Sequence, residues 1–275
     1  MRVAIVYSKL DPVGVAVSKM IAGEGFRRSD CALAVECFES GEGVKLAGYN
    51  VDQVLFEFLD ASPDPGADAV IVLSRHESSS KVRSLTVHFT GNPGPEAPFG
   101  GRPSELSYAP ADLGLSLLRH YREAAEDRGI VDRYEVTYEA THHGPTSNSK
   151  PVVFIEIGSS PEEWGDPTAQ AAMAEAVLAS VRDPPPPCAP TVGLGSTHYP
   201  AKFTAEALER GTCFGHMLSK HSLKAMSQGV LRQAVEKSLP GGAREAAVEK
   251  KGVGSELRSR ILDELRSLGV AVRMV

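Results

Sequence analysis

Short β-rich runs alternate along this chain with segments of helical periodicity, and this alternation limits the available folds more than any other feature. It predicts an α/β protein with a mixed, mostly parallel sheet and helices on both faces. Residues 69–73 and 152–157 are almost continuously apolar, so we expect them to form central strands. The predicted strands are 3–7, 32–38, 53–59, 69–74, 84–89, 134–140, 152–157, 191–194 and 270–275. The predicted helices are 11–22, 111–128, 161–181, 223–237 and 255–268.

The domain organisation depends on one connector. Residues 184–187 are four consecutive prolines, which cannot donate backbone hydrogen bonds and favour an extended, stiff conformation. We predict a single α/β domain over residues 1–275, in which residues 188–275 could form a sub-lobe after this connector. Residues 239–254, rich in glycine and mixed charge, are expected to be a mobile surface loop.

Composition excludes several classes of protein. No apolar run reaches the roughly 20 residues that a membrane helix needs, and residues 1–7 read as a strand rather than a signal peptide, so we expect a cytoplasmic protein. The net charge of −6 argues against general coating of nucleic acid. The four cysteines show no C-x-x-C spacing, so we expect buried thiols and neither a disulfide framework nor a structural zinc site.

Polar, glycine-containing or charged segments follow four of the predicted strands. They are residues 75–78, 90–94, 141–144 and 195–199, and three of them carry histidine. Ligands of open α/β sheets bind outside the carboxyl ends of the strands. We therefore expect these four segments to converge on one site.

The most informative of these segments, 140–146, reads Ala-Thr-His-His-Gly-Pro-Thr. Neutral imidazole is a common zinc ligand and also moves protons near neutral pH. Adjacent side chains on a strand point to opposite faces, so His142 and His143 can share one metal only if the following Gly-Pro turn rotates the backbone. The alternative is one imidazole bonded to the backbone and the other in solvent.

Three further residues are candidates for the same chemistry. Glu156 lies between isoleucines, and a lone buried carboxylate is costly unless it is paired, protonated or bound to metal. Its alternative is a position at the edge of the sheet, facing water. His198 lies in a turn, and His216 follows a short predicted strand at 212–214. We interpret His120 and His221 as surface residues.

The sequence lacks a Gly-x-Ser-x-Gly nucleophile elbow, a Walker phosphate loop and a Gly-x-Gly-x-x-Gly dinucleotide motif. Without an obvious nucleophile, hydrolysis by water that a metal or a general base activates is the simpler hypothesis.

Six short segments occur here in one order: 74–76 (Ser-Arg-His), 85–92 (Leu-Thr-Val-His-Phe-Thr-Gly-Asn), 140–146, 154–159 with Trp164, 195–199 (Gly-Ser-Thr-His-Tyr) and 215–217 (Gly-His-Met). Together they resemble the archaeal and plant type of D-aminoacyl-tRNA deacylase. The resemblance runs from Val3 to about Met217. It implies a core similar to that of peptidyl-tRNA hydrolases, dependence on Zn²⁺, and hydrolysis of the ester between a D-amino acid and the 3′ end of tRNA. Around His198 the family's pattern is richer in glycine.

The resemblance and the residue chemistry together give a set of site residues. The groups that we assign to catalysis are His76, His88, Thr90, Asn92 and His143, with Thr90 and Asn92 as donors to the developing oxyanion. The proposed metal ligands are His142, Glu156, His198 and His216. The groups assigned to the tRNA are Arg75, Lys81, Arg83, Arg102, Tyr199 and Lys202, which would form a local cationic rim for the acceptor end.

The implied partners are the aminoacylated acceptor end of tRNA and a D-amino acid, and neither a membrane nor an obligate protein partner is implied. One competing hypothesis is a zinc-dependent α/β hydrolase of a small molecule, such as an amidase or a nucleoside hydrolase or phosphorylase. Another is a tRNA-binding module without catalysis, in which the histidines contact the terminal adenosine.

Overall fold

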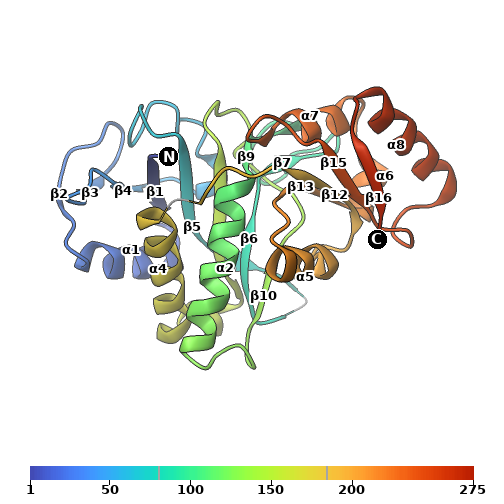
Figure 1. Ribbon diagram of the computed structural model, residues 1–275. Helices are drawn as coiled ribbons and strands as arrows, with labels where there is room; N and C mark the ends of the chain where they lie inside the picture. The colour runs from blue at the N-terminus through green and yellow to red at the C-terminus, as the bar shows by residue number, and fades with distance from the viewer. Residues whose placement is uncertain (80, 184) are drawn as a thin grey trace.

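The larger of two main sheets contains eight strands in the order β10-β6-β11-β5-β1-β4-β3-β2 (Figure 1). The computed structural model describes residues 1–79, 81–183 and 185–275. The strands of this sheet are β1 (Val3–Ser8), β2 (Arg27–Arg28), β3 (Glu36–Glu39), β4 (Lys45–Tyr49), β5 (Ala69–Glu77), β6 (Ser84–His88), β10 (Glu135–Tyr138) and β11 (Val152–Ser159). The two predicted central strands are confirmed, since β11 and β5 are paired neighbours inside the sheet.

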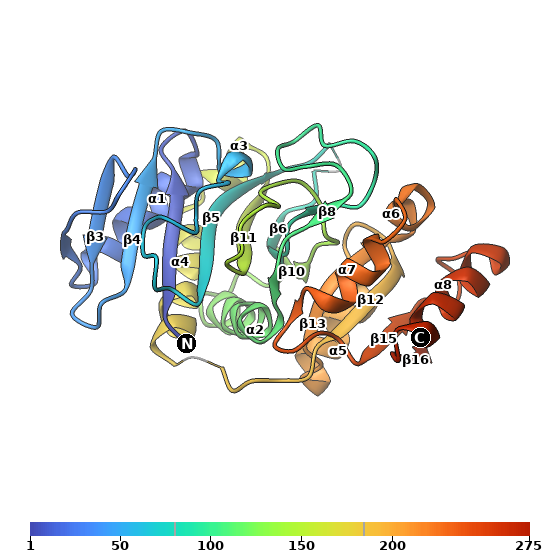
Figure 2. The same cartoon turned by 90° about the horizontal axis from the view of Figure 1, so that it is seen from above.

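Alternate side chains of the large sheet serve different purposes. On one face, Ile71, Val153 and their odd-numbered neighbours pack in the main core with helices α1 (Pro12–Gly23), α2 (Ala111–Asp127) and α4 (Pro167–Arg182), which lie together on that side (Figure 2). On the other face, Val72 and Phe154 pack against Phe56, which follows the 3₁₀ helix η1 (Gln53–Leu55).

The smaller sheet has the order β13-β12-β15-β16 and is parallel throughout. Its strands are β12 (Thr191–Ser196), β13 (Phe214–Ser219), β15 (Glu245–Val248) and β16 (Ala271–Met274). Helix α5 (Ala201–Arg210) joins the main core on one face, and the other face packs with α6 (Lys220–Ala225), α7 (Val230–Glu236) and α8 (Ser255–Ser267). The predicted α/β class with a mixed, mostly parallel sheet is confirmed, and this smaller sheet carries helices on both of its faces.

Two minor strand pairs complete the fold: β7 (Gly91–Asn92) with β8 (Glu105–Leu106), and β9 (Ala109–Pro110) with β14 (Ser238–Leu239). The division into one domain with a sub-lobe stays a prediction. The smaller sheet begins at Thr191, after the proline connector, of which Pro184 lies outside the described residues. In the described part of the chain, no helix is long and apolar enough to cross a membrane.

Four predicted elements differ most from the structure. Residues 53–59 were expected to be a strand, but Asp52 caps the 3₁₀ helix η1 there. The predicted helix 161–181 is two helices, α3 (Pro161–Trp164) and α4, because Asp166 precedes a proline and caps the second helix. The predicted helix 223–237 is two helices, α6 and α7, and Gly229, with a φ of 84°, lies at the start of the second. The predicted loop 239–254 contains β15, a strand between β12 and β16.

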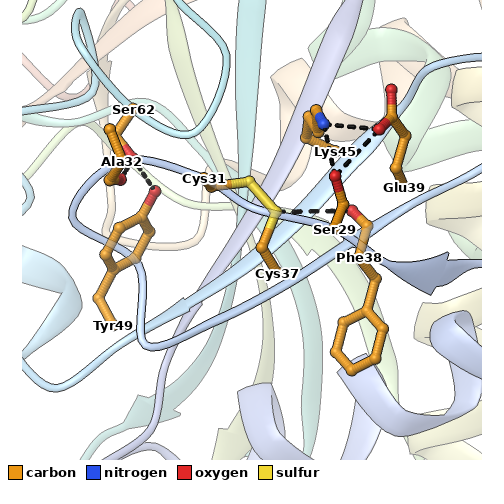
Figure 3. The surroundings of a disulfide bond; sticks show 9 residues. All are labelled: Ser29, Cys31, Ala32, Cys37, Phe38, Glu39, Lys45, Tyr49 and Ser62. Atoms are coloured by element: carbon orange, nitrogen blue, oxygen red, sulfur yellow. Dashed lines mark hydrogen bonds and ion pairs between the residues drawn. A yellow bond between two sulfur atoms is a disulfide. The ribbon is translucent and has the colours of Figure 1, made fainter.

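The expectation of free buried thiols is wrong. The four cysteines form two disulfides, Cys31–Cys37 and Cys188–Cys213, with Cα–Cα distances of 5.8 and 6.3 Å. Figure 3 shows the first disulfide beside the ion pair of Lys45 with Glu39. The second joins the connector after α4 to the residue before β13. Neither disulfide belongs to a short cysteine motif, so the sequence pattern did not predict them.

Candidate functional site

The candidate site lies on the face of the large sheet that faces away from α1, α2 and α4. The register pairs Glu156 of β11 with Ser74 of β5 on one side and with Thr86 of β6 on the other. Because side chains alternate along a strand, His76 and His88, each two residues further on, project from this same face. The site therefore lies over the face of three neighbouring inner strands, β5, β11 and β6.

The strand directions explain why the site is not at a carboxyl edge. β11 is parallel to β5 but antiparallel to β6, and β6 is parallel to β10. The carboxyl ends of β6 and β10 therefore point away from that of β5. His76, His142 and His198 do come together, as predicted. The expectation that their strands all end at one carboxyl edge of the sheet is wrong.

A cleft of about 910 Å³ opens above this face. Its walls include His76, His142, His143, Glu156 and His198. This volume is within the range of small-molecule and cofactor pockets. His88 is fully buried, and its ring centroid lies 4.4 Å from that of His142.

Glu156 is the buried carboxylate that the sequence predicts. It is only 3% exposed. Its Oε2 lies 3.3 Å from Nδ1 of His76, and its Oε1 lies 3.5 Å from Nε2 of His88. The alternative of an edge position facing water is excluded, since β11 is an inner strand.

A second buried carboxylate, Glu139, is missing from the residues predicted from the sequence. It follows β10 and is fully buried. One oxygen lies 2.8 Å from Nε2 of His198 and 3.6 Å from Nε2 of His142, and the other lies 3.3 Å from Nδ1 of His76. Neither oxygen has a hydrogen bond of normal geometry among the described residues. Glu139 thus links three of the histidines.

The paired histidines share the site because the backbone turns at His143 itself. Its φ of 43° is in the left-handed region, which a non-glycine residue rarely adopts and which recurs at functional sites. The two imidazole centroids are 4.4 Å apart. Nδ1 of His142 donates to the carbonyl of Ala140 (2.9 Å), and Nδ1 of His143 donates to that of Gly144 (2.6 Å). In the neutral rings, both Nε2 atoms are therefore acceptors.

The segment after β10 also connects the two sheets. The backbone N–H of Ala140 donates to the carbonyl of His198, and that of Thr141 donates to Met217, both at 2.8 Å. The smaller sheet thereby delivers His198 and Tyr199 to the cleft. The hydroxyl of Tyr199 lies 2.9 Å from Nε2 of His76.

Three residues predicted to serve in catalysis or metal binding are not brought to the cleft. His216 is fully buried, and its two ring nitrogens lie 3.1 Å from the Thr141 hydroxyl and 2.9 Å from the Ser107 carbonyl. The Thr90 hydroxyl donates to the carbonyl of Pro145 (2.6 Å). Asn92 Nδ2 donates to two carbonyls, those of Gly100 and Arg102. The hydrogen bonds of these three side chains stabilise the turns around the site.

The predicted cationic rim is largely paired with carboxylates. Arg75 is the one member that lines the cleft as a cation, and it bonds to buried Asp11 and lies over the Trp164 ring. The others lie outside the cleft. Arg83 pairs with Glu162 and Glu163, Arg102 is 4.0 Å from Glu105, Lys202 is 3.8 Å from Glu249, and Lys81 is exposed. Their contact with tRNA stays a prediction.

Charge divides the histidines into two groups. Burial lowers the pKa of His76, but Glu156 and Glu139 outweigh it and raise that pKa to about 9. The pKa of His88 is likewise raised by Glu156 against the effect of burial. Burial and the neighbouring imidazoles lower the pKa of His142, and they lower that of His143 to about 4.

The two carboxylates are ionised in spite of their burial. Burial alone raises the pKa of Glu139, but His198 and His76 lower it to about 2. His88 and His76 lower the pKa of Glu156 in the same way. At neutral pH the site therefore combines two carboxylates, protonated His76 and neutral His142 and His143.

Within the part of the chain that the structure describes, two sets of donors are close enough to hold a metal ion. The first is His88, His142 and His143, and the second is His76, Glu139 and His198. Within each set the ligand atoms lie within 4.8 Å of one another. Neutral imidazole nitrogens that lack another partner are suitable zinc ligands, and Nε2 of His88 is buried without a hydrogen-bond partner among the described residues.

Together, fold and site define an α/β protein with a histidine–carboxylate centre at the base of an open cleft. A family model described as D-aminoacyl-tRNA deacylase matches residues 64–273. The D-aminoacyl-tRNA deacylase of Aeropyrum pernix is 41% identical over 283 residues, covering all of both chains. That of Staphylothermus marinus is 42% identical over 98% of each chain. A crystal structure of a conserved protein of unknown function matches 99% of this chain and 95% of its own, with a TM-score of 0.90 and 28% identity.

The chain belongs to the D-aminoacyl-tRNA deacylase family. The family, the function and the class of enzyme predicted from the sequence, a hydrolase acting on ester bonds, are confirmed.

Proposed function

We propose that this protein hydrolyses the ester that joins a D-amino acid to the 3′-terminal ribose of tRNA, and that it does so at the histidine–carboxylate centre. The observation that carries this proposal is the position of the centre. Two buried carboxylates and five histidines, namely His76, His88, His142, His143 and His198, meet at the base of a cleft of about 910 Å³. Because the proposed substrate is a tRNA, we expect the protein to act in the cytoplasm.

Zinc is part of the proposal. The donors that fit it best are the Nε2 atoms of His142 and His143, which their backbone hydrogen bonds leave as acceptors, and Nε2 of His88, which has no hydrogen bond among the described residues and lies 3.5 Å from Oε1 of Glu156. A zinc ion bound by them would polarise the ester carbonyl and lower the pKa of a water molecule. This set differs from the ligands predicted from the sequence: it keeps His142, adds His88 and His143, which the sequence assigned to catalysis, and leaves out Glu156, His198 and His216.

The protein's own groups supply the proton that the reaction needs. As the oxygen of water bonds to the carbonyl carbon, the bond from that carbon to the ribose oxygen breaks, and the ribose oxygen takes up a proton from the site. Of the two protons of the water, one restores the proton of the site and the other leaves to solvent as the product carboxylate forms. His76 holds such a proton, because Glu139 and Glu156 raise its pKa to about 9. Tyr199, at 2.9 Å from His76, orients the ring and extends towards the cleft.

The first experiment measures deacylation of D-tyrosyl-tRNA and L-tyrosyl-tRNA by the purified protein, before chelation, after chelation, and after zinc is restored. We expect turnover of the D ester alone, lost on chelation and regained with zinc. A His142→Asn variant should lose the activity, whereas His221→Asn, the same change at an exposed position, should keep it.

Each part of the proposal can fail separately. Activity that survives chelation would show that the reaction does not need zinc. The imidazoles would then act as acid, base or positioning groups. Turnover of both enantiomers would remove the D-selectivity. The absence of turnover with either tRNA would favour a hydrolase of small molecules.

A further inference from the structure

One wall of the cleft carries an aromatic ring that faces water. Phe99 is 68% exposed and lines the cleft. Among the described residues, the other large hydrophobic side chains that are exposed lie elsewhere: Met1, Leu10, Leu33, Val35 and Leu55. Single exposed apolar residues are ordinary on a protein surface. The position of this one, at the cleft above the catalytic centre, is the feature that requires an explanation.

The backbone beneath Phe99 is firmly held. Its carbonyl accepts from the N–H of Gly144 (2.9 Å), the residue after His143. The next carbonyl, that of Gly100, accepts from Asn92 Nδ2 (2.8 Å). The backbone of Phe99 is therefore fixed to Gly144, the residue that follows the paired histidines.

Close packing of glycines adds to this rigidity. A Cβ atom on Gly100 would lie 2.1 Å from the carbonyl oxygen of Val54, and one on Gly144 would lie 2.4 Å from the backbone nitrogen of Gly101. Gly100 and Gly101 also have positive φ angles of 71° and 76°. The three backbone segments are in direct contact, and a ring held in this way loses little freedom when a ligand covers it.

We propose that Phe99 is the platform on which the 3′-terminal adenine of the tRNA stacks. The inference rests on the proposed function. If the ester carbonyl lies at the buried histidines, the adenosine that carries it extends outward along the cleft, where Phe99 lies. Unpaired nucleotides are recognised largely by stacking on aromatic rings. The acidic net charge and the paired arginines leave stacking as a major source of affinity at this end of the substrate.

Kinetics provides the first test. Phe99→Ala should raise KM for D-tyrosyl-tRNA by about 10- to 100-fold, the usual effect of losing one stacked base, and leave kcat nearly unchanged. Phe99→Trp should restore the wild-type KM. Leu55→Ala is the matched control, because Leu55 is 49% exposed and does not line the cleft.

A binding measurement separates this inference from the deacylase activity. A non-acylated acceptor-stem RNA with 2-aminopurine in place of the terminal adenine should lose fluorescence on binding the wild-type protein and Phe99→Trp, but not on binding Phe99→Ala. Quenching without deacylation would support stacking and contradict the proposed function. Deacylation with equal quenching by wild type and Phe99→Ala would overturn the stacking inference. So would a KM for D-tyrosyl-tRNA that Phe99→Ala leaves unchanged.

Discussion

Glu139 is the residue that joins most of the histidines and yet has no hydrogen bond of normal geometry of its own. Burying an ionised carboxylate is costly, so this position persists only where cations or a metal compensate for it. Its charge determines two properties at once, the protonation of His76 and the orientation of His198.

Replacing Glu139 by Gln keeps the shape and removes the charge. We expect kcat for D-tyrosyl-tRNA to fall by about 100-fold or more, with a smaller effect on KM. The pKa of His76, raised by this carboxylate and by Glu156, should decrease, and an NMR titration of the imidazole would measure it. Glu135→Gln, on the exposed part of the same strand, should change neither quantity. An unchanged pKa of His76 in Glu139→Gln would contradict the role given to Glu139.

The sequence contains a signal for Glu139, but the signal has another common meaning. Polar residues at 135, 137 and 139 alternate with apolar ones at 136, 138 and 140, and such alternation is typical of a strand with one face in water. Here the polar face meets the buried centre. Glu156 was predictable because isoleucines surround it, and the histidines were predictable because they form short motifs. Phe99 gave no signal, since its exposure depends on the fold.

At the scale of elements, the sequence predicts the strands well and their directions poorly. Continuous apolar runs identify β5 and β11, and periodicity identifies α1, α2 and α8. No local pattern reveals that β6 runs antiparallel to β11, because direction depends on how the long connections cross the sheet. This is why the site was expected at an edge and lies on a face.

The pairing of β5 with β11 makes one glycine critical. Gly158 is opposite His76 in the register, and a Cβ atom there would lie 2.7 Å from Cδ2 and 2.8 Å from Cβ of His76. Gly158→Ala should push the imidazole away from Glu139 and Glu156 and lower kcat by about 100-fold, the cost of a small misplacement. Gly41→Ala, where nothing lies within 4 Å, is the control. Wild-type kcat in Gly158→Ala would show that the ring position matters little.

At the scale of the whole molecule, the centre depends on two sheets. The large sheet provides His76, His88 and Glu156, and the smaller sheet provides His198 and Tyr199. The disulfide between Cys188 and Cys213 closes a loop with a sequence separation of 25 at the start of the smaller sheet. Cysteine spacing could not predict this bond, because only the packed fold brings the two residues to a Cα–Cα distance of 6.3 Å.

Removing that disulfide should destabilise the protein measurably. By chain entropy, Cys188→Ser with Cys213→Ser is expected to cost about 3.5 kcal/mol, seen as a lower Tm in non-reducing buffer. The Cys31–Cys37 pair closes a shorter loop, with a separation of 6, so the corresponding double variant should lose less. Identical Tm values for wild type with and without reductant would contradict this prediction.

The position of the site residues on one face of the large sheet also limits where the chain can gain or lose residues. His76, His88 and Glu156 all project from one side because each occupies the correct parity along its strand. Insertion or deletion of a single residue within β5 or β11 would turn every later side chain of that strand to the helix-covered side. Insertions in the surface loops leave that parity intact. We therefore expect functional relatives to differ in loop length and to keep the residue spacing within these two strands unchanged.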